Sequence, residues 1–382
     1  MMLKVKTKSL WNIFKLFFIF FFIIIDIYYL KICNIREKIL LKGRKYLNRC
    51  LKEKLNRKIY PEFVNPRVSV IIPVYNCQNS IKQAIRSIQY QKMIDIEIIL
   101  VNDKSNDESI KIIQKFQKTD KRIKLINNKK NMGTLYSRSI GVLQSKGKYI
   151  FPLDNDDMFF DNNVFNIIYE EAYTFTYDIV GFKTIQTENY KAKIYEMRDV
   201  CHMHKNNFTI FKPNLSLFGI SKNNRFKIRE AHIWSKCIKH SIYKKAVNSL
   251  GRKRYSFFMS WAEDTSMVFV LFNVAESYRY ITKYGIFKCN RKNSAEHSMP
   301  KSHKLFGEIF FLDVIFDFTH NDYKSKKFAF YQAMHICKGK FFKSLNEINI
   351  RYLKKTLNKL LFCPFINNED KAKLKINFKK II

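Results

Sequence analysis

The chain has 382 residues, 47% hydrophobic and 27% charged, which is typical of a globular protein with a sizeable core and excludes a disordered one. Its formal net charge is +38, because 70 Lys and Arg residues stand against 32 Asp and Glu. The lysines are spread along the whole chain without a zinc-finger or RNP-like pattern, so we expect no nucleic-acid partner. The eight cysteines include no C-x-x-C pair, which argues against a zinc site and against a disulfide framework.

The first long apolar segment covers residues 11–30, after a short tail at residues 1–10. About 20 apolar residues suffice to cross a membrane, and no small-residue cleavage site follows. The sequence therefore predicts an uncleaved, single-pass anchor that makes the membrane a partner. Basic residues flank the segment on both sides and two Asn-x-Ser/Thr sequons lie downstream, so an ER/Golgi lumenal domain and a cytosolic one both stay open. Residues 31–66 are predicted to form a basic stem.

Strand and helix patterns alternate over residues 67–185. A continuous apolar run predicts a strand at residues 68–73, and further strands are expected at 97–101, 123–126 and 149–153. Helical spacing lies between the strands at residues 80–91, 110–116 and 133–143. This alternation predicts βαβ units, hence an α/β fold with a mostly parallel sheet flanked by helices. Ser80 is expected to cap the first of these helices.

Polar residues follow the carboxyl ends of three of these strands. They are Tyr75, Asp103 and an Asp-Asn-Asp-Asp cluster at residues 154–157. Ligands of open α/β sheets bind outside the carboxyl ends of the strands, so these residues should converge. Mg²⁺ typically uses one or two carboxylates together with substrate phosphates. The cluster is therefore either a metal and diphosphate site or an acidic turn, because Asp and Asn favour turns for backbone reasons.

Four ordered motifs carry a resemblance to a known family. They are VSVIIPVYN at residues 68–76, ILVNDKSND at 99–107, NMG with SRS within 131–139, and GKYI leading into DNDD within 147–157. Together they resemble the family 2 glycosyltransferases of the GT-A fold, over about residues 67 to 290. The resemblance implies an inverting enzyme that moves a sugar from a nucleoside-diphosphate sugar, with a UDP-sugar favoured, to an acceptor hydroxyl. A dinucleotide site is disfavoured, because no G-x-G-x-x-G follows the first strand.

The resemblance assigns residues 67–185 to nucleotide-sugar binding. The residues implied in this role are Pro73, Tyr75, Asn76, Asp103, Arg138, Asp154 and Asn155. Among them, Asp103 would accept a hydrogen bond from N3–H of uracil, Tyr75 would pack on the base, and Arg138 would touch the nucleotide. Two alternatives stay open, namely a helix cap for Asp103 and a solvated helix face for Arg138.

The resemblance also implies Mn²⁺ or Mg²⁺ as a cofactor that bridges the diphosphate. Asp156 would be the primary metal ligand, and Asp154 would bind the metal while facing the nucleotide sugar. Asp157 would either support these ligands or cap the following helix. Whether Arg291 or His297 contacts the diphosphate or the metal is left open.

A second carboxylate pair follows in the predicted acceptor and catalytic-base half, residues 186–299. An inverting transfer needs a carboxylate that takes the proton of the acceptor hydroxyl. The resemblance makes Asp264 this base and Glu263 its orienting neighbour, whereas the alternative is an ordinary helix start whose dipole favours acidic residues. Trp234 and Lys236 form a Trp-x-Lys segment that is expected to shape the acceptor side.

Residues 300–382 are predicted to be a basic helical region whose apolar stripes serve packing. Leu305, Ile309, Leu353 and Leu357 belong to these stripes. The chain lacks a Gln-x-x-Arg-Trp segment and has one hydrophobic span, so we expect a non-processive transfer rather than an extruding synthase. The acceptor, whether glycan, lipid or protein, stays undetermined. The alternative function is a catalytically inactive, membrane-tethered binding protein on the same fold.

Overall fold

A computed structural model describes residues 60–187, 231–259, 261–289, 300–318, 347–362 and 368–379, with shorter pieces inside 31–49 and 198–228. The predicted tail and anchor at residues 1–30 lie outside the described residues, as do Arg291 and His297. Within the described part of the chain, no helix is both long and apolar enough to cross a membrane.

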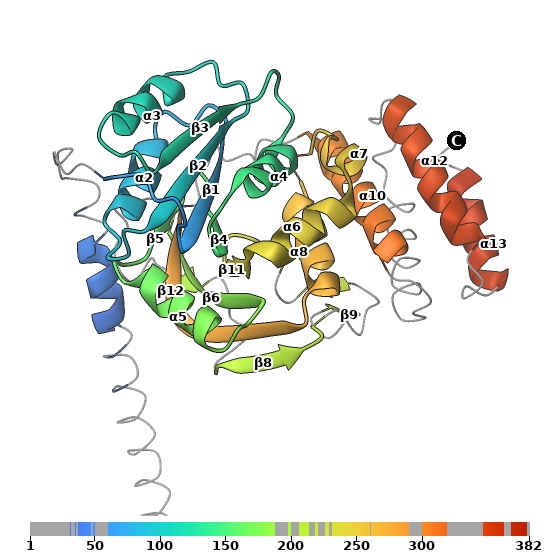
Figure 1. The fold of residues 1–382 in the computed structure, drawn as a ribbon. Coiled ribbons are helices and arrows are strands. Elements are labelled where there is room, and N and C mark those ends of the chain that lie inside the picture. Colours follow the sequence, from blue (N-terminus) through green and yellow to red (C-terminus); the bar gives the residue numbers. More distant parts are fainter. Residues whose placement is uncertain are drawn as a thin grey trace, which may run out of the picture.

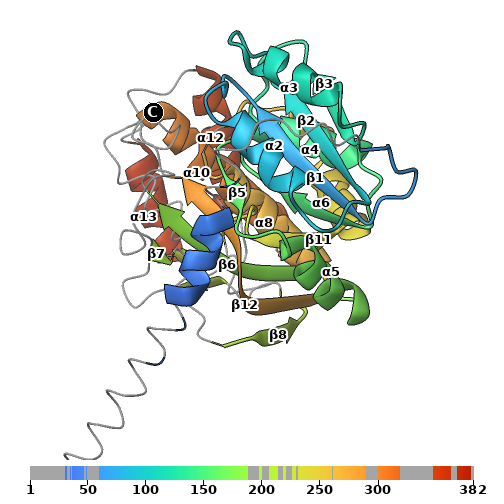
Figure 2. The same ribbon diagram turned by 90° about the vertical axis from the view of Figure 1, so that its left-hand side faces the viewer.

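A single large sheet runs through the molecule (Figure 1), with the strand order β3-β2-β1-β4-β11-β6-β12-β5. Its strands are β1 (Val68–Val74), β2 (Ile96–Asn102), β3 (Ile123–Asn127), β4 (Tyr149–Pro152), β5 (Met158–Phe159), β6 (Ile179–Thr187), β11 (Lys236–Lys239) and β12 (Ser277–Cys289). Two further strands pair at its side, β7 (Arg198–Asp199) with β6 and β8 (Phe208–Phe211) with β12, and Figure 2 shows β8 along the outer edge. A separate antiparallel pair joins β9 (Phe218–Ile220) and β10 (Phe226–Ile228).

The α/β class is confirmed, but the sheet is mixed rather than mostly parallel. Strands β3, β2, β1 and β4 are parallel, as the alternating pattern predicts. The next strand in space, β11, runs antiparallel to both β4 and β6. It enters from the opposite direction and separates β4 from β6, which itself pairs in parallel with β12. Strand β6 crosses residue 185, so the two predicted halves share one sheet.

Helices cover both faces of the sheet. They are α2 (Ile81–Gln89), α3 (Ser109–Gln117), α4 (Thr134–Gln144), α5 (Val164–Thr174), α6 (His240–Leu250), α7 (Arg252–Tyr255), α8 (Glu263–Val274), α10 (Lys301–Phe318), α12 (Glu347–Leu361) and α13 (Asn368–Lys379). Alternate residues of β1 explain the layering: Val70 and Ile72 pack with α2, α3 and α5, whereas Ile71 packs with α4, α6 and α8. Ser80 occupies the predicted N-cap position of α2, but its side chain does not make the capping hydrogen bond, because the hydroxyl donates to the carbonyl of Cys77.

The described part of the predicted stem contacts the α/β core. Residues 37–46 are helical, and the hydroxyl of Tyr46 donates to the carbonyl of Ser87 on α2, 2.7 Å away. Leu40 is buried in the same cluster as α2. The stem therefore packs against the face of the sheet that α2 covers, rather than standing apart from it.

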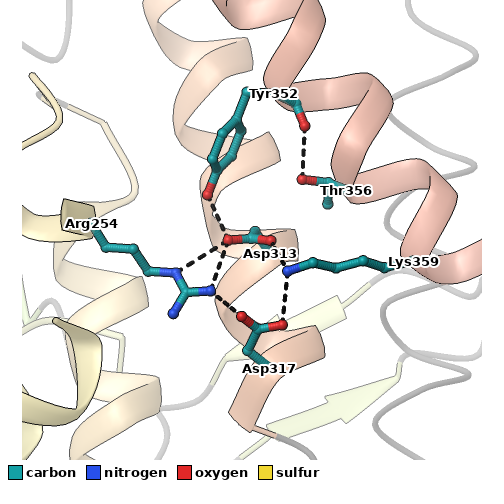
Figure 3. A network of polar contacts seen from close by, with 6 residues as sticks. All are labelled: Arg254, Asp313, Asp317, Tyr352, Thr356 and Lys359. Atoms are coloured by element: carbon teal, nitrogen blue, oxygen red, sulfur yellow. Dashed lines mark hydrogen bonds and ion pairs between the residues drawn. The ribbon is translucent and has the colours of Figure 1, made fainter.

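The C-terminal region is helical where the structure describes it, as predicted. Figure 1 shows α10, α12 and α13 beyond α8, on the side away from β1, β2 and β3. A charge network fastens α12 and α7 to α10 (Figure 3): Asp313 accepts from Arg254, from the hydroxyl of Tyr352 at 2.6 Å and from the ammonium of Lys359 at 2.6 Å. Asp317 pairs with the same Arg254 and Lys359. Two carboxylates thus share two cations, so no unpaired charge is left in this network.

Candidate active site

The acidic turn begins where β4 ends, and its side chains have different partners. The amide of Asn155 donates to the carbonyl of Pro73 at 3.0 Å, which ties the turn to the end of β1. The backbone N–H of Asp157 donates to the carbonyl of Asp154 at 3.1 Å and closes the turn. Buried Asp157 accepts from the backbone N–H of Cys289, whereas its Oδ2 has no donor among the described residues. The predicted helix cap for Asp157 is wrong, because β5 follows the turn.

The charges of this turn are poorly compensated by the protein. Burial raises the pKa of Asp157 well above its usual value, and the charges of Asp156 and Asp154 add to that shift. Burial also raises the pKa of Asp154, and the positive charge of Arg138 opposes the shift. Carboxyls that favour the neutral form gain stability when a cation approaches them. These shifts are compatible with a bound cation at the turn, and the metal site stays a prediction.

Arg138 on α4 joins the acidic turn to the predicted catalytic base. Its Nη1 donates to Oδ1 of Asp264 at 2.6 Å, and its Nη2 donates to Oδ1 of Asp154 at 2.9 Å. The Arg138 side chain is 3% exposed, so the alternative of a solvated helix face is wrong. Two carboxylates that are far apart in the sequence therefore meet at one guanidinium.

The start of α4, and with it Arg138, is fixed by Asp103. One carboxylate oxygen of Asp103 accepts from the backbone N–H of Met132 and the amide of Asn128, both at 2.8 Å. The other accepts from the backbone N–H of Gly133 at 2.6 Å. A carboxylate has about four lone-pair sites, so one is left for a nucleotide base. Asp103 thus supports the entry to α4, and its contact with uracil stays a prediction.

The loop after β1 contains Tyr75 and Asn76, which differ in their surroundings. Asn76 adopts a left-handed conformation with φ 45°, and its side-chain oxygen accepts from the N–H of Asn106 at 2.9 Å. Its own N–H donates to the hydroxyl of Ser105 at 3.1 Å, so Asn76 joins the loops that follow β1 and β2. The Tyr75 side chain is 46% exposed beside them. An exposed ring on a braced loop is suited to stacking on a planar ligand.

Glu263 and Asp264 are the first two residues of α8, but their states differ. Burial raises the pKa of Glu263 to about 8, and the charge of Asp264 adds to the shift. This shift favours the protonated form of Glu263 near neutral pH, whereas Asp264 forms an ion pair with Arg138. A general base must be unprotonated, so Asp264 suits that role better than Glu263. Ala262, directly before the pair, has φ 58°, which costs an L-residue about 1–2 kcal/mol.

The strained segment before α8 is held on two sides by glycines. A Cβ added to Gly133 would lie 2.7 Å from the carbonyl oxygen of Met259, and Gly133 itself has φ +86°. A Cβ added to Gly307 on α10 would lie 2.3 Å from the carbonyl oxygen of Trp261. Both helices approach the backbone closely because these positions have no side chain. The C-terminal region thus directly supports the segment that leads into Asp264.

Two lysines lie near Trp234. Lys236 is buried, and its ammonium donates to the carbonyl of His232 at 2.6 Å, so it supports this segment, and the role of the segment on the acceptor side stays a prediction. Sequence reasoning missed Lys288, near the end of β12. Its ammonium lies 5.0 Å from the centre of the Trp234 ring, and its charge opposes the pKa shifts of the acidic turn. One lysine among 70 Lys and Arg gave no signal in the sequence.

The described residues limit how a metal ion can be held. They contain no group of three or more His, Cys, Asp or Glu side chains arranged to bind one. Mg²⁺ ordinarily takes one or two carboxylates and completes its shell with waters and substrate phosphates. Asp154, Asp156 and the orphaned oxygen of Asp157 therefore fit a cation that arrives with a diphosphate better than one bound by protein alone.

The mixed α/β sheet, with its acidic turn at the end of β4, places the chain in the class of GT-A-like folds. The chain is similar in fold to the solved structure of Staphylococcus aureus TarS 1–349 in complex with UDP-GlcNAc, with a TM-score of 0.57 and 14% identity. The similarity covers 82% of this chain and 88% of that one. The family described as Glycosyl transferase family 2 matches residues 69–237. Residues 69–237 therefore match the family that the motifs resemble, which confirms the predicted resemblance.

Curated relatives agree with this family. The chain is 40% identical over 116 residues to EpsJ of Bacillus subtilis, an uncharacterized glycosyltransferase, covering 30% of this chain and 33% of that protein. It is 28% identical over 182 residues to the GalNAc(5)-diNAcBac-PP-undecaprenol beta-1,3-glucosyltransferase of Campylobacter jejuni, covering 44% and 59%. The chain thus spans less than two thirds of the length of these relatives. The family match ends at residue 237, before Glu263, Asp264 and Lys288.

Proposed function

We propose that this chain is an inverting, metal-dependent glycosyltransferase that uses a nucleoside-diphosphate sugar, with UDP-sugar as the favoured donor, and transfers single sugars non-processively. The observation that carries the proposal is the shared guanidinium of Arg138. It binds Asp264, the proposed base, at 2.6 Å and Asp154, on the proposed donor side, at 2.9 Å. Transfer at an anomeric carbon requires the acceptor and the donor to be held close together in one site.

The proton of the acceptor hydroxyl goes to Asp264 in this proposal. Oδ1 of Asp264 is occupied by Arg138, and Oδ2 has no hydrogen-bond donor among the described residues. As Oδ2 takes the proton, the acceptor oxygen bonds to the anomeric carbon, and the bond from that carbon to the diphosphate oxygen breaks on the opposite side. Glu263 holds its own proton near neutral pH and therefore does not compete for this role.

The donor would lie along the carboxyl ends of β1, β2 and β4. The remaining lone pair of Asp103 would accept from a uracil N3–H, and the exposed ring of Tyr75 would stack on the base. Asp156, with Asp154, would hold Mn²⁺ or Mg²⁺. A metal ion bound there supplies positive charge against the charge that develops on the leaving diphosphate.

The rival proposal is a catalytically inactive binding protein on the same fold. It would be favoured if the chain lacked Asp156 or Asp264, and the chain has both. The contacts of Arg138 also support the enzyme, because they place the carboxylate of Asp264 beside Asp154 on the proposed donor side.

Calorimetric titration and a product assay on the purified full chain would test this proposal. With Mn²⁺ present, the wild type should bind UDP and slowly hydrolyse a UDP-sugar. Asp156→Asn should abolish metal-dependent UDP binding, whereas Asp264→Asn should keep binding and lose transfer. Glu276→Gln, an exposed carboxylate just after α8, is the matched control and should change neither. A wild-type chain that neither binds UDP nor hydrolyses any UDP- or GDP-sugar would overturn the proposal.

A further inference from the structure

We propose that Lys288 binds the diphosphate of the nucleotide, as a protein cation that acts beside the metal ion. This inference rests on the proposed function, and it assigns a residue that lies outside the family match at residues 69–237. It also names the phosphates, rather than the base or the sugar, as the part of the donor that Lys288 recognises.

The position of Lys288 is fixed relative to the acidic turn. The residue after it, Cys289, donates its backbone N–H to Oδ1 of Asp157 at 3.1 Å. This bond holds the end of β12 against the turn. In the same strand, Phe287 pairs with Met158 of β5, directly after the turn. The backbone on both sides of Lys288 is therefore held by pairing and hydrogen bonding, so Lys288 does not lie on an unsupported loop.

The Lys288 ammonium is close to the turn without being neutralised by it. It lies 5.0 Å from the centre of the Trp234 ring, at the distance of a cation–π contact. Within the described residues it forms no ion pair at 4.0 Å or less, although its charge acts on both Asp154 and Asp157. The ring holds the ammonium beside the turn, so little conformational freedom remains to be lost when an anion binds.

Two other cations lie near the turn among the described residues, and both already have partners. The guanidinium of Arg138 forms ion pairs with both Asp264 and Asp154. Lys236 is buried against the carbonyl of His232. A diphosphate placed beside a turn of three carboxylates requires positive charge, and a compact ammonium binds phosphate oxygens as a point charge. Among the residues that the structure describes, Lys288 is placed to supply this positive charge.

A packing role is the competing explanation, because a lysine stem can cover an aromatic ring for hydrophobic reasons alone. The two explanations differ in what they predict for ligands. If Lys288 binds the diphosphate, its removal weakens the binding of UDP and leaves the binding of uridine unchanged. If Lys288 only packs on Trp234, its removal displaces the ring and weakens the binding of both ligands. Lys183, on the neighbouring strand β6, offers a matched control, because its ammonium lies 5.5 Å from the centre of the Tyr284 ring on β12.

The experiment is calorimetric titration of the full chain with UDP and with uridine, in saturating Mn²⁺. Lys288→Met should weaken UDP binding by about tenfold or more, as expected for a lost hydrogen bond to a charged group, and leave uridine binding unchanged. Lys288→Arg should retain most of the UDP affinity, and Lys183→Met should match the wild type. Unchanged UDP affinity in Lys288→Met, or equal losses for UDP and uridine, would overturn the inference alone. A wild-type chain that binds neither ligand would overturn the proposed function as well.

Discussion

Replacing Arg138 by Met tests whether this guanidinium joins the two carboxylates energetically. Breaking a buried ion pair costs roughly 3–5 kcal/mol, whereas an exposed pair contributes about 0.2–1 kcal/mol. Arg138 is 3% exposed, but Asp264 and Asp154 are 20% and 31% exposed, so water can partly solvate them once the cation is lost. We therefore expect the variant to lose about 2–3 kcal/mol of unfolding free energy at neutral pH.

The loss should depend on pH in a defined direction. Arg138 opposes the burial that raises the pKa of Asp154, so in the variant that pKa rises further. The folded variant then takes up protons that the unfolded chain does not hold, and the penalty of the unpaired charge is relieved as the pH falls. Urea unfolding at pH 7 and at pH 4 should show the full loss at the higher pH and a smaller loss at the lower one.

Arg122→Met provides the control for this prediction. Arg122 forms a fully buried pair with Asp120, at 2.8 Å and away from the acidic turn. Its removal should cost at least as much stability and leave UDP affinity unchanged, whereas Arg138→Met should also lose sugar transfer. The reasoning would be refuted if Arg138→Met changed the unfolding free energy by less than about 0.5 kcal/mol, the size of an ordinary surface substitution, or retained full transfer.

Three further changes test other parts of the structure. The pKa of Glu263 rises from 4.5 to about 8 on folding, so between those pH values the folded chain binds a proton that the unfolded chain does not, and stability falls as the pH rises. Glu263→Gln should remove this pH dependence of the unfolding free energy in urea unfolding. An unchanged pH dependence would contradict the assignment. Gly133→Ala should lower the melting temperature, because its φ of +86° and a Cβ 2.7 Å from the Met259 oxygen both oppose a side chain; an unchanged melt would contradict this. Lys359→Met should cost about 1–3 kcal/mol by leaving Asp313 underpaired, with UDP affinity unchanged by titration; an equal loss of affinity would place the network in the binding site.

The parallel half of the fold follows from local patterns, and the antiparallel part does not. Strands β1, β2 and β4 are mostly apolar and buried along their whole length, because both of their faces are covered by helices. Strand β11 has four residues, and its place in the sheet depends on pairing of Ile238 with Ile150 and of Cys237 with Val180. Such pairings depend on tertiary packing, so nothing near residue 236 in the sequence indicates the direction of the strand.

The sequence singles out residues for the candidate site, but it does not indicate most of the contacts that they make. Motif residues such as Asp103 and Asn76 hold backbone N–H groups of neighbouring loops, a function that the sequence does not distinguish from ligand binding. The double pairing of Arg138 was not predicted either, because it depends on how α4 packs beside α8. Lys288 was missed for a different reason, since no local pattern separates it from the many other lysines.

The three carboxylates of the acidic turn are not equivalent, and their partners give a physical order. Asp154 forms an ion pair with Arg138, and buried Asp157 accepts a hydrogen bond from the backbone N–H of Cys289. A cation that arrived with a diphosphate would have to share Asp154 with the guanidinium, whereas contact with Asp156 requires no displacement of Arg138. This supports the proposal that Asp156 is the primary ligand. It also means that any movement of Asp154 toward a metal pulls on the guanidinium that holds Asp264, so donor binding and orientation of the proposed base would be coupled through one side chain.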